Sequence, residues 1–151
     1  MAEHHVGLRW KLEADAFTYE TYNRSHDLVF KNGAQIVRTS AAPAYKGDAA
    51  LADPEDMLVA ALSSCHMLTF LAIASKRKLP LDSYHDAAVG YLEKNEVGRL
   101  AITRVILRPR IQWSVGVAVS DADLDTLHHQ AHEGCFIANS VTTDVRVEPR
   151  R

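Results

Sequence analysis

The sequence predicts a single α+β domain that spans residues 1–151. Three observations lead to this prediction. Strand-like segments lie before, between and after two helical segments. The longer helical segment, from Met57 to Ser75, contains no Asp, Glu, Lys or Arg, which is expected of a buried central helix. Short strands with one apolar face do not cover such a helix on all sides, so we expect a dimer to complete the core.

The first third of the chain carries strand and turn signals. FTYETY, from Phe17 to Tyr22, is rich in aromatic and β-branched residues and is predicted to be a strand. HDLVF and AQIVR then flank Asn32 and Gly33, the preferred pair for a type I′ turn. We therefore predict a β-hairpin here, followed by a loop that contains prolines and a glycine.

The central helix has a marked start and a marked end. Asp53 has the side chain of an N-cap, and Pro54 suits the first helical position. The two acidic residues that follow are favoured there by the helix dipole. The basic run 76–78 and then Pro80 mark the C-terminal end.

The same apolar run raises the question of a membrane span. It contains Ser63, Ser64, His66 and Thr69, and much of the remainder is alanine rather than leucine or isoleucine. We therefore predict a core helix and no membrane partner.

The second half of the chain predicts two strands, a helix and a last strand. The two strands are Tyr84–Leu92 and Ala101–Trp113, joined by a polar loop. Ser120 is the predicted N-cap of the second helix, and Gly134 is its predicted end. FIANS is predicted to form a short helical turn, and VTTDVRVE alternates as a half-buried strand does.

Composition and charge argue against several classes of partner. The formal net charge is −2, which favours neither a polyanion nor an anionic membrane. Arg104, Arg108 and Arg110 share one face of a predicted strand, and we interpret them as a solvated surface rather than a nucleic-acid site. The N-terminal segment shows no apolar signal-peptide core, so we expect a cytoplasmic location.

The two cysteines are the first candidate functional residues. In a reducing compartment they are either inert packing residues or redox-active. Cys65 lies about eleven residues into its helix, too far from the N-terminus for the dipole to stabilise a thiolate, so a cation from another segment is required. Cys135 follows Gly134 and begins a new turn, which favours a thiolate. If the thiols are neighbours, a sulfenic acid on one condenses with the other.

The histidines offer rival interpretations. His128 and His132 share one helix face and Cys135 follows shortly after, a spacing that resembles zinc ligands, with His66 as candidate fourth ligand. A Cys–His hydrolase with His66 or His132 as base is a further alternative, although no third orienting residue is apparent. The sequence contains no P-loop, G-x-G-x-x-G or G-x-S-x-G, so no nucleotide cofactor is expected.

The stretch DPEDMLVAALSSCHMLTFL resembles the OsmC/Ohr family of osmotically inducible and organic-hydroperoxide-resistance proteins. Family members begin a long central helix with Asn/Asp-Pro-Glu and carry their first cysteine ten residues after the glutamate. The corresponding residues here are Asp53, Pro54, Glu55 and Cys65. The second family cysteine lies near the end of the next long helix, where AHEGCFIANSV places Cys135. The order of strands and helices is similar over essentially the whole chain.

The resemblance implies an OsmC-like fold, with antiparallel sheets around the central helix, and an intertwined homodimer with active sites at its interface. It implies a thiol peroxidase that acts on organic hydroperoxides or hydrogen peroxide. In that activity Cys65 attacks the peroxide and becomes a sulfenic acid, and Cys135 resolves it as a disulfide. An external dithiol, a dihydrolipoyl group in well-studied branches, then reduces the disulfide, and no metal or other cofactor is implied.

The resemblance also implies an arginine that stabilises the Cys65 thiolate and is held by Glu55. We choose Arg24, because its loop position between two predicted strands lets it swing toward the site. Arg38 and Lys46 are the rivals, and lysine is a weaker fork for holding two anionic groups together. On one helix Glu55 and Cys65 lie about 15 Å apart along the axis. A bridging arginine, or pairing of Glu55 with the cysteine of the other subunit, resolves that separation.

The sequence also departs from the Ohr branch. Phe136 follows the second cysteine where Ohr proteins tend to have proline, and His66 follows the first where Phe is frequent. These departures point to the broader OsmC-like group, whose substrates are less well defined. Met67, Leu68 and Phe70 are candidate lining residues for a pocket, with core packing as the alternative. Two other functions stay open, a non-catalytic stress or binding protein of the same fold and the zinc-binding domain.

Overall fold

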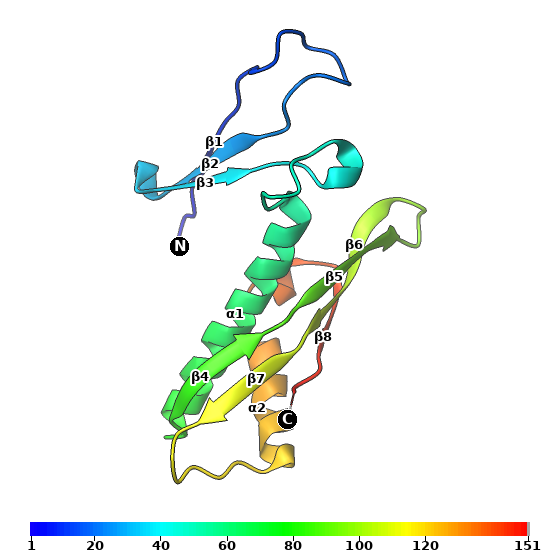
Figure 1. Cartoon of the computed structure of the whole chain (residues 1–151). Helices are drawn as coiled ribbons and strands as arrows, with labels where there is room; N and C mark the ends of the chain where they lie inside the picture. Colours follow the sequence, from blue (N-terminus) through cyan, green and yellow to red (C-terminus); the bar gives the residue numbers. More distant parts are fainter. Residues whose placement is uncertain (151) are drawn as a thin grey trace. The chain divides into compact units, whose positions relative to one another are not determined.

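The computed structural model describes residues 1–150, which divide into two compact units. The N-terminal unit is Met1–Met57, and the C-terminal unit begins at Leu58. Each is described by itself, and the expectation of a single domain stays a prediction. The elements are the strands β1 (Val6–Arg9), β2 (His26–Phe30), β3 (Gln35–Thr39), β4 (Leu81–Asp86), β5 (Val89–Lys94), β6 (Leu100–Leu107), β7 (Pro109–Trp113) and β8 (Asp144–Val147), the helices α1 (Pro54–Lys76) and α2 (Asp121–Glu133), and 3₁₀ turns at Lys31–Gly33, Pro43–Tyr45 and Ala138–Ser140 (Figure 1).

The N-terminal unit is built on an antiparallel sheet in the order β1-β2-β3. The predicted hairpin between β2 and β3 is confirmed, with Phe30 opposite Gln35. Its connection runs from Lys31 to Ala34 and is therefore longer than the predicted two-residue type I′ turn. Within it Lys31, Asn32 and Gly33 all take positive φ (51°, 54° and 95°). Asn and Gly tolerate this region better than other residues, which explains the Asn-Gly pair.

The predicted strand Phe17–Tyr22 is wrong, because this segment is a loop with turns. Its hydroxyl groups bond locally instead of leaving the backbone free for a sheet. Thr21 Oγ1 donates to the carbonyl oxygen of Ala16 at 2.6 Å, and the Thr18 and Thr21 hydroxyls lie 2.7 Å apart. Such local bonds compete with strand pairing.

Helix α1 begins and ends close to where the sequence predicts. The backbone N–H of Asp56 donates to Asp53 Oδ1 at 2.8 Å, which confirms Asp53 as the N-cap. After Lys76 the chain leaves the helix through Lys78, whose φ is 57°. The apolar run is therefore one continuous helix, as predicted.

The C-terminal unit contains the four strands β4 to β7 where the sequence predicted two long strands, and β8 follows where the last strand was predicted. Figure 1 shows β4 continuing into β5 and β6 into β7, and each pair is divided by a short break. At the break Asp86 Oδ1 accepts a hydrogen bond from the backbone N–H of Arg108 at 2.6 Å, and Pro109 follows directly. A carboxylate and a proline thus interrupt pairing between backbones.

These strands form two sheets. β4 pairs with β7, and β6 lies between β5 and β8. Pairing is antiparallel except between β6 and β8, which run parallel. The predicted strand VTTDVRVE is therefore present, shortened to Asp144–Val147.

Helix α2 follows its predicted boundaries. Ser120 Oγ accepts a hydrogen bond from the backbone N–H of Asp123 at 3.1 Å, so Ser120 is the N-cap. Gly134 ends the helix, and the predicted turn in FIANS is the 3₁₀ turn Ala138–Ser140.

A first core cluster joins the two helices. Phe70 and Ala74 of α1 pack with Leu124, Leu127 and Ala131 of α2, and all are buried. The cluster also contacts side chains from the sheet side of the unit, namely Leu81, Tyr84, Ile111 and Trp113. This packing holds the second half of α1 beside α2.

A second core cluster joins α1 to β6. Leu62 packs with Val105 and Leu107, and all three have no exposed surface. The helix approaches the sheet so closely that a Cβ on Gly90 would lie 2.5 Å from Val59 Cγ2.

Within one chain, the buried part of α1 is a stripe at helical spacing. Leu62, His66, Phe70 and Ala74 are buried, whereas Leu68 on another face is 60% exposed. By length and composition α1 is also apolar enough to cross a membrane, and within residues 1–150 no other helix is. The predicted partner chain and the predicted absence of a membrane partner both stay predictions.

Candidate active site

The structure brings the two cysteines together in the C-terminal unit. Cys65 lies on α1 and is half-buried, whereas Cys135 lies just after α2 and is 1% exposed. Their side chains are close enough to interact, and both are free thiols. The sequence separation of the two residues is therefore closed by the packing of α1 against α2.

The surroundings of Cys135 act on its thiol in opposite directions. Burial raises the pKa of the Cys135 thiol above its usual range, and the neighbouring Cys65 side chain adds to this. The backbone amides that begin the next turn oppose it, and the N–H of Ala138 donates to Cys135 Sγ at 3.4 Å. The turn predicted to favour a thiolate is present, but burial outweighs it, so Cys135 is a protonated thiol at neutral pH.

Arg24 lies in the N-terminal unit, in the loop before β2. Its two terminal NH groups donate to the carbonyl oxygens of Tyr19 and Tyr22, each at 2.5 Å. The guanidinium carbon also lies 3.7 Å from the centre of the Tyr22 ring. Carbonyl groups and aromatic rings carry no formal charge, so none of these contacts gives Arg24 a counter-ion.

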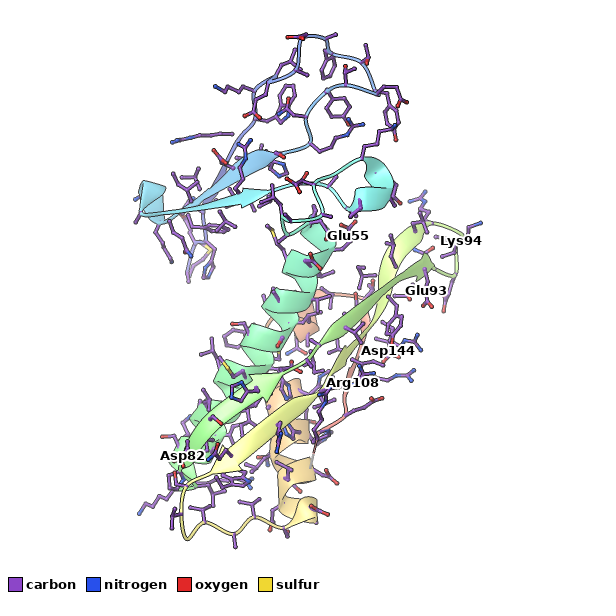
Figure 2. The ribbon with its side chains drawn as sticks, in the orientation of Figure 1. Glu55, Asp82, Glu93, Lys94, Arg108 and Asp144 are labelled. Carbon is purple, nitrogen blue, oxygen red and sulfur yellow. The ribbon has the colours of Figure 1, made fainter. Side chains whose placement is uncertain are left out.

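Arg24 and Glu55 line the same cavity of about 520 Å³ within the N-terminal unit. Glu55 lies in the first turn of α1 (Figure 2). Within residues 1–150 the two side chains make no ion pair with each other. The role of Glu55 in holding the arginine stays a prediction.

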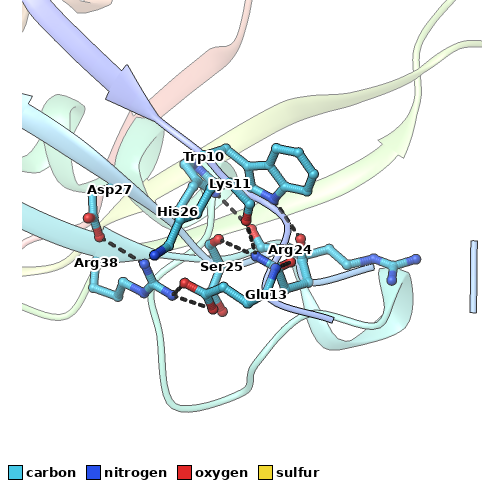
Figure 3. Close-up of polar contacts among 9 residues, drawn as sticks. Trp10, Lys11, Glu13, Arg24, Ser25, His26, Asp27 and Arg38 are labelled. Atoms are coloured by element: carbon cyan, nitrogen blue, oxygen red, sulfur yellow. Dashed lines mark hydrogen bonds and ion pairs between the residues drawn. The ribbon is translucent and has the colours of Figure 1, made fainter. Parts of the chain in front are cut away.

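The rival cations are already paired with carboxylates. Arg38 binds Glu13 at 3.0 Å and Asp27 at 3.2 Å (Figure 3), and these carboxylates raise its pKa. Lys46 forms an ion pair with Glu20. Neither lines the cavity that contains Glu55. Their charge is compensated where they stand, whereas Arg24 makes no ion pair within residues 1–150.

The predicted catalytic residues thus form two pairs. Arg24 and Glu55 belong to the N-terminal unit, and Cys65 and Cys135 belong to the C-terminal unit. Their chemical roles stay predictions.

A model of the family described as OsmC-like protein matches residues 47–150. The chain belongs to the OsmC-like family. It is similar to an OsmC-like protein of unknown function from Vibrio cholerae, at 43% identity and a TM-score of 0.94, with 99% of this chain and 100% of that one covered.

More distant OsmC-like structures share the fold. An organic hydroperoxide resistance protein OsmC from Legionella pneumophila is 17% identical with a TM-score of 0.71, and 100% of each chain is covered. The organic hydroperoxide resistance protein OhrB of Bacillus subtilis is 17% identical with a TM-score of 0.70, with 99% of this chain and 98% of that one covered. A search of the curated proteins gave no match.

The predicted zinc ligand set of this OsmC-like chain is not assembled. Within residues 1–150 no three His, Cys, Asp or Glu side chains lie together in a way that holds a metal ion. His128 turns instead toward His66, with Nδ1 of the former 3.0 Å from Nε2 of the latter, and Cys135 turns toward Cys65. The expectation that His128, His132 and Cys135 form a metal site is therefore wrong.

Two features of this OsmC-like chain were missed or misplaced by sequence reasoning. The hydrogen bond between buried His66 and His128 was not predicted, although the zinc alternative had placed His66 near His128 as a candidate fourth ligand. Phe70, a candidate pocket residue, has no exposed surface and stacks on His128 with ring centres 4.6 Å apart. It is a core residue, and the cavity beside Arg24 is lined by aromatic residues from earlier in the chain, including Trp10 and Phe17.

Proposed function

We propose that this OsmC-like protein is a cytoplasmic, homodimeric thiol peroxidase that reduces organic hydroperoxides or hydrogen peroxide. Cys65 is the nucleophile and Cys135 is the resolving thiol. Arg24 stabilises the Cys65 thiolate, and Glu55 orients Arg24. The organic hydroperoxide resistance proteins of the same fold suggest the substrate class. The two cysteines, Arg24 and Glu55 of this chain are the residues proposed to carry out the reaction.

The proposed cycle balances in three steps. The Cys65 thiolate attacks one peroxide oxygen, the O–O bond breaks, and the other oxygen leaves as an alkoxide that takes up a proton and becomes the alcohol. The Cys135 thiol then attacks the Cys65 sulfenic acid, an S–S bond forms and water leaves. An external dithiol, of the dihydrolipoyl kind, reduces this disulfide and is itself oxidised to a disulfide.

The observation that carries the proposal is the proximity of the two thiols. Cys65 and Cys135 are the whole cysteine content of the chain, and they interact in the packed C-terminal unit. A buried cysteine that serves only as a packing residue does not need a second thiol beside it. The protonated state of Cys135 also suits a resolving role, because it leaves the attack on peroxide to the more exposed Cys65.

The proposed homodimer explains the exposed face of α1. It also provides the cation that the Cys65 thiolate needs, namely Arg24 of the other subunit. Leu68 lies on the largely apolar helix α1 and is 60% exposed, because no side chain among the described residues of one chain covers it. A second copy packed on this face would bury it. In the proposed assembly, the cavity with Arg24 and Glu55 of one subunit serves the Cys65 of the other.

Intact-mass analysis after one equivalent of cumene hydroperoxide tests the mechanism. The wild-type chain should lose two hydrogens and regain them with a dithiol. Cys135→Ser should stop at the sulfenic acid, seen as the gain of one oxygen and trapped by dimedone. Cys65→Ser should show neither change.

Steady-state turnover separates the remaining alternatives. Peroxide consumption with dihydrolipoamide should vanish in Cys65→Ser. Full activity in that variant would refute the assignment of the nucleophile. A non-catalytic binding protein of the same fold would consume no peroxide in the wild-type form.

A further inference from the structure

The cavity beside Arg24 has walls made of aromatic rings. Trp10, Phe17, Tyr22 and Tyr45 all line it. Its volume of about 520 Å³ falls within the range of small-molecule sites, roughly 300 to 1,000 Å³. These rings precede residues 47–150, the part matched by the family model, so they are a property of this chain's N-terminal segment.

The side chain of Asn23 helps to hold the loop that carries these rings. Asn23 Oδ1 accepts from the backbone N–H of Glu13 at 2.8 Å, and Asn23 Nδ2 donates to the carbonyl oxygen of Lys11 at 3.0 Å. The indole Nε1–H of Trp10, labelled in Figure 3, donates to the backbone carbonyl oxygen of Asn23 at 2.7 Å. The cavity wall is therefore set before a ligand arrives, which reduces the entropic cost of binding.

The rings already contact one another in the geometry that aromatic groups prefer. Trp10 and Phe17 are edge to face, with centres 5.9 Å apart and planes at 66°, and Phe17 and Tyr22 are 5.4 Å apart. Phe17 nevertheless stays 70% exposed and Trp10 43% exposed. The cluster thus offers open ring surface to a further ring.

The charges at the cavity argue against ionic ligands. Arg24 already covers the face of the Tyr22 ring at 3.7 Å. Arg24 and Glu55 line the same cavity with opposite formal charges, so the cavity favours neither sign of net charge on a ligand. Arg24 lines the cavity, and the carbonyl oxygens of Tyr22 and Tyr19 engage only part of its guanidinium N–H groups, so donors remain for a neutral oxygen.

We infer that this cavity selects neutral ligands that carry an aromatic ring next to an oxygen. Resting on the function proposed above, the preferred substrates are then hydroperoxides of aromatic compounds rather than of straight-chain ones. Each aromatic pair contributes about 0.5 to 1.5 kcal/mol beyond area burial, and a rigid ring loses less freedom on binding than a flexible chain.

A binding experiment tests this selectivity without turnover. In a Cys65→Ser, Trp113→Phe variant, Trp10 is the remaining tryptophan, and its fluorescence reports on the cavity. The probes are 2-phenyl-2-propanol and 1-nonanol, alcohols of equal carbon count. We expect the aromatic alcohol to bind about tenfold more tightly, which corresponds to ~1.4 kcal/mol.

Two further variants give the control. Phe17→Leu, at an exposed position, should fold normally and lose most of the preference, whereas Leu8→Ala, exposed and outside the cavity lining, should keep it. Equal affinity for the two alcohols, or an unchanged preference in Phe17→Leu, would overturn the inference. Selective binding by a protein whose wild-type form consumes no peroxide would refute the proposed function and leave the aromatic selectivity standing.

Discussion

His66 Nε2 and His128 Nδ1 lie 3.0 Å apart in the interior of the C-terminal unit, where both side chains are almost fully buried. One ring must donate and the other accept, and because each has a pKa of about 4 both are neutral at pH 7. Burial lowers the pKa of His66 from 6.5 to about 4, with His128 and His132 adding to the effect and Asp86 opposing it. Burial likewise lowers the pKa of His128 to about 4.

The protein should therefore lose stability in mild acid. The unfolded chain takes up protons on these histidines near pH 6.5, whereas the folded chain does so only near pH 4. The two neutral histidines contribute fully to the free energy of unfolding above the unfolded-state pKa, and this contribution is lost as the pH falls toward the folded-state pKa. The loss in unfolding free energy is on the order of 2 kcal/mol per histidine by about pH 5. Urea unfolding at fixed protein concentration, from about pH 7 to about pH 5, measures the loss.

A double variant isolates this effect. His66→Phe with His128→Leu should flatten the pH dependence of the unfolding free energy over that range. His5→Ala should leave it unchanged, because His5 is exposed. An equal acid loss in the double variant would show that other groups are responsible.

Arg24→Ala should lower kcat/KM for hydroperoxide roughly 100-fold, the loss expected when one preorganised charged donor is removed from an active site. Arg24→Lys should restore little, because an ammonium group cannot reproduce the fork of hydrogen bonds. Arg38→Ala should stay close to wild type, because Arg38 is already bound by Glu13 and Asp27. Steady-state kinetics with cumene hydroperoxide measure all three, and a larger loss in Arg38→Ala than in Arg24→Ala would reverse the assignment.

Leu68→Glu should weaken the proposed homodimer at least about tenfold, because it places a charge on the exposed face of α1 and costs ~1.4 kcal/mol or more of association free energy. Leu100→Glu is the matched control, since Leu100 is 59% exposed against 60% for Leu68 but lies on β6. Sedimentation equilibrium gives both dissociation constants. A monomeric wild-type protein, or equal weakening by both changes, would contradict the α1 interface.

Gly90→Ala should destabilise the C-terminal unit by about 1 to 3 kcal/mol, because the added Cβ would lie 2.5 Å from Val59 Cγ2 on the facing helix. Val59→Ala in the same chain should recover part of the loss. Gly7→Ala, whose Cβ meets its nearest neighbour at 3.5 Å, should cost less. Urea unfolding gives each value, and strict additivity of the Gly90 and Val59 changes would show that the two side chains do not collide.

The helices could be predicted from sequence because their signals are local. Asp53 and Ser120 bond amides three residues further along the chain, and the structure shows both caps. Pro109 is a local sign of the break between β6 and β7. The hydrogen bond from Arg108 to Asp86 at the two breaks could not be predicted, because the two residues are distant in sequence and have no local pattern in common.

The candidate site divides in the same way. The resemblance to a family indicated Cys65 and Cys135, because the spacing of Cys65 from the Asp53-Pro54-Glu55 start of its helix is a local signal in the sequence. The aromatic cavity was missed, because FTYETY carries the composition of a strand while Thr18 and Thr21 fold it into a loop. A loop held by its own side chains has no periodicity to detect.

The unequal exposure of the two thiols has a practical use. A maleimide-linked dye or a mercurial, applied briefly to the native protein, will modify the half-buried Cys65 and spare Cys135, which is 1% exposed. Site-specific labelling and phasing derivatives are thus within reach of the unmodified gene product.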